Sequence, residues 1–276
     1  MKANYHTHLK LCGHAEGMSS DYVEVAIKEG LEIIGISDHG PIKPEFMTPE
    51  EFKYNWLERQ MTYEDFLNIY LPDCYSTKEK YKEKIKVLVG VEIEYLYPFH
   101  EYYLKLREKL EYMNLAVHFY YHNDVITNSF DDVTYDNVYS YALNAKKAME
   151  TGLFEIMVHP DVYMYHYKSY DGSTKFDDQC EKTARLIIES AIKNNVYLEI
   201  NVGGIFKVTS NNEVLGQFAY PRDEFWRIAS EYKDLKVVVG IDAHKPEHLV
   251  ENEIKMAYEF ARKHNIIISE KVETIG

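Results

Sequence analysis

Metal-capable side chains recur along this chain at the end of nearly every short apolar run. His6 and His8 follow the first run, and Asp242 and His244 follow the last. Alternate residues of a strand point to the same face, so each of these pairs can direct both side chains at one ion. The other acids and histidines at such positions are Asp38, His39, Glu92, Glu94, His118, His159 and Asp161. Their recurrence after six separate runs predicts a shared metal site.

A mixed set of imidazoles and carboxylates indicates a catalytic rather than a structural site. Burying this many polar and charged groups without cations would cost several kcal/mol for each ion, and metal ions supply the compensating charge. With no thiolate in the set, the ligands suit Zn, Fe or Mn with open coordination positions. The candidates are too numerous for one ion. Cys12 lies near these histidines in the sequence, and we expect it to be a small, partly buried thiol.

The elements that must position these residues alternate between apolar runs and amphipathic stretches. Several runs are apolar and rich in β-branched residues, which is typical of strands buried on both faces of a parallel sheet. They cover residues 33–36, 87–93, 115–117, 155–158, 196–200 and 237–241, with a shorter candidate strand at 3–7. This alternation predicts an α/β fold with parallel strands. In barrel enzymes the carboxyl ends of such strands converge on the active site.

Helical spacing of apolar residues follows three of these runs. The segments are 19–30, 178–195 and 246–265. We expect the first helix to begin after an N-cap at Ser19 or Ser20 and to stop at Gly30. Residues 42–84 depart from this alternation of apolar runs and amphipathic stretches. They are rich in aromatic and charged residues and contain several prolines. We interpret this segment as an elaborated connection with one or two helices whose aromatic side chains pack against the barrel.

Length and composition exclude several classes of protein. The 276 residues suffice for one large domain or two small ones, and 46% hydrophobic with 28% charged residues excludes a disordered chain, a collagen-like repeat and a membrane-spanning bundle. A net charge of −14 argues against nucleic-acid binding. No apolar run approaches the roughly 20 residues of a membrane span, and the N-terminal residues lack the apolar core of a secretory signal. The three cysteines form no disulfide pattern, so we expect a cytoplasmic protein.

The chain resembles the PHP (polymerase and histidinol phosphatase) superfamily and, within it, the monofunctional histidinol-phosphate phosphatases. The resemblance extends from end to end and is carried by His6-Thr7-His8 with His14, Ser37-Asp38-His39, Gly90-Val91-Glu92, Ala116-Val117-His118, His159-Pro160-Asp161 and Gly240-Ile241-Asp242-Ala243-His244. It implies a distorted (β/α)7 TIM-like barrel as a single domain over residues 1–276. The aromatic-rich insert, at about 42–84, would follow the second strand.

The resemblance also implies three divalent metal ions, Zn, Fe or Mn. The first would be held by His6, His8, Glu92 and Asp242. The second would share Glu92 and be held by His118 and His159. The third would be held by His14, His39 and His244. Asp38 is expected either beside these ligands or among them, and the candidates for catalysis are Glu92, His118, Asp242 and Asp38.

The reaction expected from the resemblance is hydrolysis of L-histidinol phosphate to L-histidinol and phosphate, as in histidine biosynthesis. A metal-bound hydroxide would attack phosphorus without a covalent phosphoenzyme. Alternatives with the same ligands are another small phosphate ester, a nucleotide or phosphotyrosine. The expected partner is thus a small phosphorylated metabolite, not a nucleic acid or a membrane, and the oligomeric state is not predicted. Candidate substrate-binding residues are Arg222, Lys207, Lys168 and His166.

Overall fold

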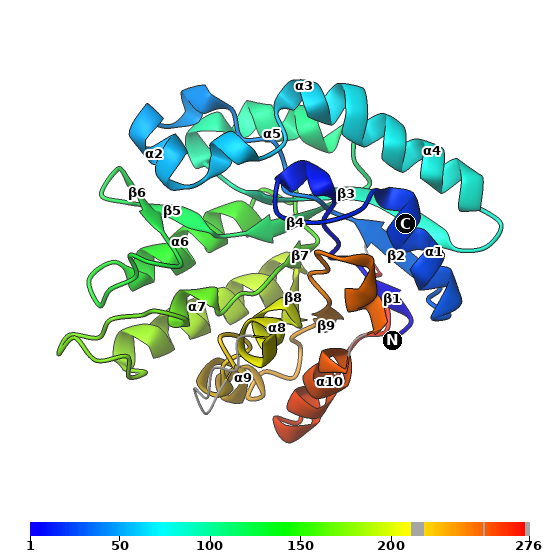
Figure 1. Cartoon of the computed structure of the whole chain (residues 1–276). Helices are drawn as coiled ribbons and strands as arrows, with labels where there is room; N and C mark the ends of the chain where they lie inside the picture. Colours follow the sequence, from blue (N-terminus) through cyan, green and yellow to red (C-terminus); the bar gives the residue numbers. More distant parts are fainter. Residues whose placement is uncertain (211–217, 251, 274–276) are drawn as a thin grey trace.

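A seven-stranded parallel sheet forms the centre of the computed structural model, which describes residues 1–210, 218–250 and 252–273 (Figure 1). The strands lie side by side in the order β1 Ala3–Asn4, β2 Ile33–Ile36, β3 Lys86–Glu94, β4 Tyr112–Ala116, β7 Ile156–Met157, β8 Tyr197–Asn201 and β9 Val237–Gly240. The two edges nearly meet, because Thr7 and Ala243 form a parallel bridge and the His8 amide donates to the Ala243 carbonyl at 2.8 Å. The predicted distorted (β/α)7 barrel is confirmed.

The side chains of the strands divide into two apolar layers. One fills the barrel interior and includes Ile33, Leu88 and Tyr112, whereas neighbours such as Ile34 face the helices outside. Tyr112 spans the interior and donates its hydroxyl to the Tyr5 carbonyl at 2.9 Å. A Cβ atom at Gly35 would lie 2.2 Å from that hydroxyl oxygen, and one at Gly90 would lie 2.5 Å from the same ring. The glycines in these two strands therefore make room for the tyrosine.

The helices surround the barrel (Figure 1). Those outside the insert are α1 Ser19–Lys28, α5 His100–Arg107, α6 Val138–Met149, α7 Asp178–Asn194, α8 Gly203–Ser210, α9 Asp223–Ala229 and α10 Glu253–Lys263, with short 3₁₀ turns η1 Lys10–Cys12, η5 Tyr97–Phe99, η6 Val162–Met164 and η7 Pro246–Val250. The predicted segment 178–195 is confirmed, and Asn195 ends it in the left-handed conformation. The segment 246–265 is divided between η7 and α10, and residue 251 lies outside the described part.

The N-cap of α1 is Met18, not Ser19 or Ser20 as predicted. The Asp21 carboxylate accepts the Met18 backbone N–H at 2.8 Å. This is the bond that the third helical residue makes to the N-cap in a capping box. Ser19 instead donates its hydroxyl to Asp73 of the insert at 2.5 Å. The N-cap signal was misassigned because the serine is used for a tertiary contact. The predicted stop is confirmed, since Gly30 has a φ of 74°, in the left-handed region.

The insert between β2 and β3 contains more segments than the one or two helices predicted. They are η2 Pro44–Phe46, α2 Pro49–Tyr54, η3 Leu57–Arg59, α3 Tyr63–Asp65, the π-helical η4 Phe66–Tyr70 and α4 Leu71–Tyr81. Packing against the barrel is confirmed for Phe66 and Tyr70, which are fully buried. The Tyr70 hydroxyl lies 3.1 Å from the Ile36 carbonyl and 2.6 Å from the Gly90 carbonyl, which ties the insert to β2 and β3. Trp56, by contrast, is 55% exposed.

An antiparallel hairpin that was not predicted follows β4. Its strands are β5 Phe119–His122 and β6 Val125–Asn128. The hairpin lies outside the main sheet and contacts the insert, because the Asn128 side-chain amide donates to Asn55 at 3.3 Å. None of the helices in the described ranges is both long enough and apolar enough to pass through a lipid bilayer.

Candidate metal centre

The nine side chains predicted as metal ligands lie at the carboxyl ends of the barrel strands. They come from seven stretches of the chain: His6 and His8 after β1, His14 after η1, His39 after β2, Glu92 in β3, His118 after β4, His159 after β7, and Asp242 and His244 after β9. Each of them contacts at least one other member of the set. The structure therefore brings all nine together in one cluster.

Four ligand atoms face one another at the first position of this cluster. His6 Nε2 lies 3.1 Å from His8 Nε2, which lies 3.0 Å from Asp242 Oδ1. The Glu92 oxygens lie 3.5 Å from His6 Nε2 and 3.4 Å from His8 Nε2. Atoms bound to a tetrahedral zinc ion at its usual distances are about 3.3–3.6 Å apart. The four side chains thus surround a space of the right size for such an ion.

Glu92 links this position to a second one. Its Oε1 lies 2.7 Å from His159 Nε2 and 3.5 Å from His118 Nε2, and the two ring nitrogens are 3.3 Å apart. Glu92 lies in the interior of β3 and is 1% exposed. One buried carboxylate therefore faces imidazoles on two sides, which is the arrangement of a carboxylate that bridges two cations.

Three more imidazoles form a third position. The ligand atoms of His14, His39 and His244 all lie within 4.8 Å of one another. His39 Nδ1 also lies 3.1 Å from Glu92 Oε2, so this group adjoins the other two. Asp38, whose role was left open, accepts the His39 backbone N–H at 2.9 Å, and its Oδ1 lies 3.5 Å from His8 Nδ1. The aspartate is therefore placed beside the ligands, where it can orient His8.

Acceptors outside the cluster hold several of these rings in orientation. His6 Nδ1 lies 2.9 Å from Glu199 Oε1, and His118 Nδ1 lies 2.6 Å from Glu94 Oε1. A ring nitrogen that donates to such an oxygen leaves the lone pair on Nε2 free for a metal. The same holds for two histidines whose Nδ1 atoms lie 3.0 Å from backbone carbonyls: His14 and His244.

The electrostatics of the cluster are those of ionised carboxylates among imidazoles. Burial alone would raise the pKa of Glu92, but the charge of neighbouring imidazoles, chiefly His118, holds it well below its usual value. The same balance lowers the pKa of Asp242. Burial lowers the pKa of His6, yet Glu199 and the other nearby acids raise it to about 10. The cluster therefore retains protons that a divalent cation would displace on binding.

Several buried polar atoms of the cluster have no hydrogen-bond partner within the described residues. They are His8 Nδ1, Asp38 Oδ2, Glu92 Oε2 and His159 Nδ1. An unpaired polar atom in the interior costs about 1–3 kcal/mol, and more when it is charged. Cations in the cluster would offset the charge of the carboxylates and occupy their free lone pairs. The residues present thus fit divalent metal ions.

The motifs of this centre belong to a known family. The model of the PHP domain matches residues 4–203 of the chain, which is most of its length. The chain belongs to the PHP domain family. Asp242 and His244 lie beyond the matched residues, so their membership of the centre rests on the geometry described above.

Similar proteins extend over nearly the whole PHP chain. A protein named "Probable histidinol-phosphatase" in Schizosaccharomyces pombe is 23% identical over 90% of this chain and 82% of its own length. One of the same name in Deinococcus radiodurans is 24% identical, over 87% and 85%. Among solved structures, the histidinol phosphate phosphatase of Lactococcus lactis, in complex with zinc, L-histidinol and phosphate, has a TM-score of 0.67. It is 17% identical, with 97% of this chain and 95% of that chain covered.

Two acids support the PHP centre from outside the predicted ligand sets. One oxygen of Glu199 lies 2.9 Å from Nδ1 of His6, and its other oxygen accepts the His159 backbone N–H at 3.1 Å. Glu94 holds His118. The signal for Glu199 was available, because a charged residue interrupts the apolar run 196–200 and is 1% exposed in the structure. Cys12 was expected to be partly buried but is 1% exposed and adjoins the cluster.

A cavity of about 540 Å³ opens over the PHP centre. Besides the metal-capable residues, its walls include the insert residues Asn55, Trp56, Arg59 and Gln60, together with Phe130 and Lys207. The insert therefore supplies part of the wall rather than only packing against the barrel. Arg59 was not predicted as a cavity residue. It places an exposed guanidinium near the opening.

Of the four predicted substrate-binding residues, the cavity is lined by Lys207 and by none of the other three. Arg222 is buried, and its backbone N–H donates to Asp161 at 2.6 Å. Lys168 and His166 are exposed elsewhere, and the ring of His166 stacks on Tyr165. The prediction of a substrate contact at Arg222, Lys168 and His166 thus finds no support in the cavity. The three contacts therefore stay predictions. They were inferred from proximity to a strand end in the sequence, which does not fix the direction of a loop side chain.

Proposed function

We propose that this protein is a metal-dependent phosphomonoester hydrolase that converts L-histidinol phosphate and water into L-histidinol and phosphate. The proposed centre contains three divalent ions, Zn, Fe or Mn, held by the nine clustered ligands. The protein would act on this small metabolite in the cytoplasm, where its cysteines, of which none forms a disulfide among the described residues, would stay reduced.

One observation carries this proposal: Glu92 faces His6 and His8 on one side and His118 and His159 on the other. When bound, adjacent divalent ions supply a Lewis acid for the phosphoryl oxygens and lower the pKa of a coordinated water. The protein's part is to fix their spacing through one rigid carboxylate on a buried strand. Glu199 and Glu94 in turn fix the rings of His6 and His118.

The cavity walls favour a small phosphate ester that carries a flat ring. Trp56 presents an exposed indole to the cavity, and its backbone is left-handed at φ 57°. This conformation costs a non-glycine residue about 1–3 kcal/mol and is concentrated at functional sites. We assign Trp56 to stacking on the imidazole of the substrate, and Arg59 and Lys207 to attracting the phosphate.

The alternative is a phosphatase that acts on another small ester, a nucleotide or phosphotyrosine, because the same ligands would serve each of these. The discriminating experiment is a panel of substrates with protein reconstituted separately with zinc, iron and manganese. We expect kcat/KM for histidinol phosphate to exceed that for p-nitrophenyl phosphate, phosphotyrosine and nucleotides by at least about tenfold, which corresponds to 1.4 kcal/mol of transition-state binding.

Equal or poorer turnover of histidinol phosphate would reject the substrate and leave the metal-dependent hydrolase in place. Absence of activity on every ester, with metal bound, would reject the hydrolase itself.

A further inference from the structure

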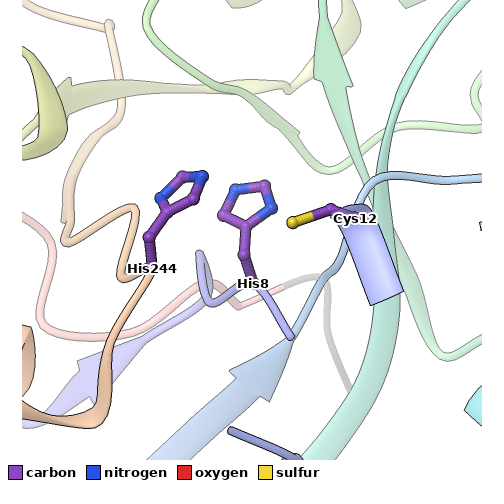
Figure 2. A group of neighbouring side chains, drawn as sticks. All are labelled: His8, Cys12 and His244. Atoms are coloured by element: carbon purple, nitrogen blue, oxygen red, sulfur yellow. The ribbon is translucent and has the colours of Figure 1, made fainter. Parts of the chain in front are cut away.

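Cys12 lies at the edge of the metal centre and has no role in the proposed ligand sets. It ends η1 and is 1% exposed. Its sulfur and the ligand atoms of His8 and His244 all lie within 4.8 Å of one another. Figure 2 shows one ring nitrogen of His8 directed at the sulfur and the other directed at a ring nitrogen of His244. The three side chains therefore form a further metal-capable group.

The loop that carries Cys12 is fixed on both sides. The His8 amide is bonded to Ala243, and the Lys10 amide donates to the Gly17 carbonyl at 3.0 Å. Gly13 has a φ of 78°, and a Cβ atom there would lie 2.5 Å from the Arg59 carbonyl oxygen. The backbone of the loop is thus held between the barrel and the insert, and it fixes the position of Cys12 beside the cluster.

His8 supplies independent evidence for a thiolate at this sulfur, because a ring that binds a metal through Nε2 carries its proton on Nδ1 and needs an acceptor there. Its Nε2 faces His6 and Asp242 in the first position. Its Nδ1 has no hydrogen-bond partner in the described part of the chain, although the residue is completely buried. The thiol donates to the Leu9 carbonyl at 3.2 Å. Because S–H is a weak donor, loss of this hydrogen bond would destabilise the loop little.

We propose that Cys12, as a thiolate, is a ligand of a divalent ion bound at the side of the cluster formed by His8 and His244. The S–H bond breaks as the sulfur–metal bond forms, and its proton passes to solvent with no change of oxidation state. His8 keeps its Nδ1 proton and donates it to the thiolate, while its Nε2 stays a ligand of the first ion. A thiolate selects zinc over manganese, because softer ligands favour softer ions. This inference rests on the metal centre in the proposed function but not on the choice of substrate.

The three cysteines of the chain give a matched set of variants. Cys74 and Cys180 are also buried and unpaired, but they belong to α4 and α7 and to none of the metal-capable groups found in the described residues. The experiment is zinc-edge X-ray absorption on the full-length zinc-loaded protein, its Cys12→Ser variant, and the double variant Cys74→Ser/Cys180→Ser.

We expect a sulfur neighbour at about 2.3 Å from zinc in the wild-type protein and in the double variant, beside nitrogen and oxygen at about 2.0–2.2 Å. In Cys12→Ser only the lighter neighbours should remain. A wild-type spectrum without sulfur, or a sulfur neighbour that persists in Cys12→Ser, would overturn the inference.

A cobalt titration of the double variant keeps the proposal testable if Cys12→Ser does not fold. Cys12 is then the sole cysteine, so a thiolate-to-cobalt charge-transfer band must come from it, and absence of the band overturns the inference. Neither readout measures hydrolysis. A zinc–sulfur bond in a protein inactive on histidinol phosphate would reject the substrate proposal alone, and an active enzyme without that bond would reject the Cys12 assignment alone.

Discussion

Glu92 is the residue on which the proposed chemistry depends most, because its carboxylate faces both the His6–His8 and the His118–His159 sides of the cluster. We predict that Glu92→Gln lowers kcat/KM by more than about 100-fold and reduces the number of bound ions, since an amide cannot bridge two cations as a carboxylate does. Steady-state kinetics and metal analysis of the purified variant check both effects.

Glu94→Gln is the matched control, two residues further along β3. Glu94 contacts His118 from outside the cluster, so its loss should cost only about 10–100-fold, the usual effect of removing a partner of a metal ligand. The assignment of Glu92 fails if Glu92→Gln keeps its full metal content and wild-type activity.

A substitution of Trp56 should change substrate binding without lowering stability. Trp56→Gly removes the indole from the cavity and also relieves a left-handed backbone, so the variant should bind histidinol phosphate more weakly and unfold no more easily than the wild type. We predict a KM for histidinol phosphate raised about 2–10-fold, from a stacking contribution of about 0.5–1.5 kcal/mol. The KM for a phosphate ester without a ring should not change. An unchanged KM for both esters would remove Trp56 from the substrate site.

At the scale of elements, the N-terminus of α7 provides a test of stability. Asp177 caps the helix by accepting the backbone N–H groups of Gln179 and Cys180, and it also accepts the hydroxyls of Tyr167 and Ser169. Burial opposes its charge, but these hydrogen bonds lower its pKa below the usual 3.8. We predict that Asp177→Ala costs about 2 kcal/mol of unfolding free energy at pH 7.

The pH dependence of that loss has a definite sign. A carboxyl whose folded pKa is lowered stabilises the protein above its unfolded pKa and ceases to do so as the pH falls through the folded value. The difference between wild type and Asp177→Ala should therefore be constant near neutral pH and shrink below about pH 4. Urea unfolding of metal-free protein measures this difference. The control is Asp178→Ala, because Asp178 makes an exposed ion pair with Lys182 and its removal should change stability little at any pH. A difference that grows in acid would contradict the capping role.

The elements that the sequence predicted well are those with a continuous apolar run. The run at 33–36 coincides with β2, and the runs at 87–93 and 196–200 fall within one or two residues of β3 and β8. β2 and β8 are buried along their whole length and β3 from Val87 onward, so their side chains are mostly apolar apart from the polar residues of the site. The metal-capable residues could be predicted for the same reason. Polar groups at the ends of apolar runs do not contribute to apolar packing, so they indicate a site.

The hairpin β5–β6 and the insert were poorly predicted because their partners are distant in sequence. The hairpin residue Asn128 bonds to Asn55, and Tyr70 bonds to strands on either side of the insert. No local pattern reports such contacts. The sequence does not show the direction of loop side chains either, and for this reason Arg59 was not predicted as a cavity residue.

For the whole molecule, the proposed function requires an acidic chain to bind an anionic substrate. A net charge of −14 would repel a phosphate ester, whereas divalent cations bound in the centre would make the local potential positive. The same cations should stabilise the fold, because they neutralise Glu92 and Asp242 in the barrel interior. A ligand present at 100 times its dissociation constant contributes about 2.7 kcal/mol.

We therefore predict that removal of the metals by a chelator lowers the melting temperature by several degrees and that zinc restores it. Differential scanning calorimetry checks this, with Glu92→Gln as the control in which the shift should be much smaller. Equal melting temperatures with and without metal would show that the cations contribute nothing to the folded state.

Strand ends from the whole chain gather around Glu92, and we propose that several cations share this carboxylate. Anomalous diffraction at the zinc edge, from crystals of zinc-loaded protein, tests it most directly. We predict three peaks inside the barrel mouth, two of them about 2.0–2.2 Å from oxygens of Glu92 and the third beside His14, His39 and His244. An empty cluster, or zinc bound only at sites away from Glu92, would contradict the account.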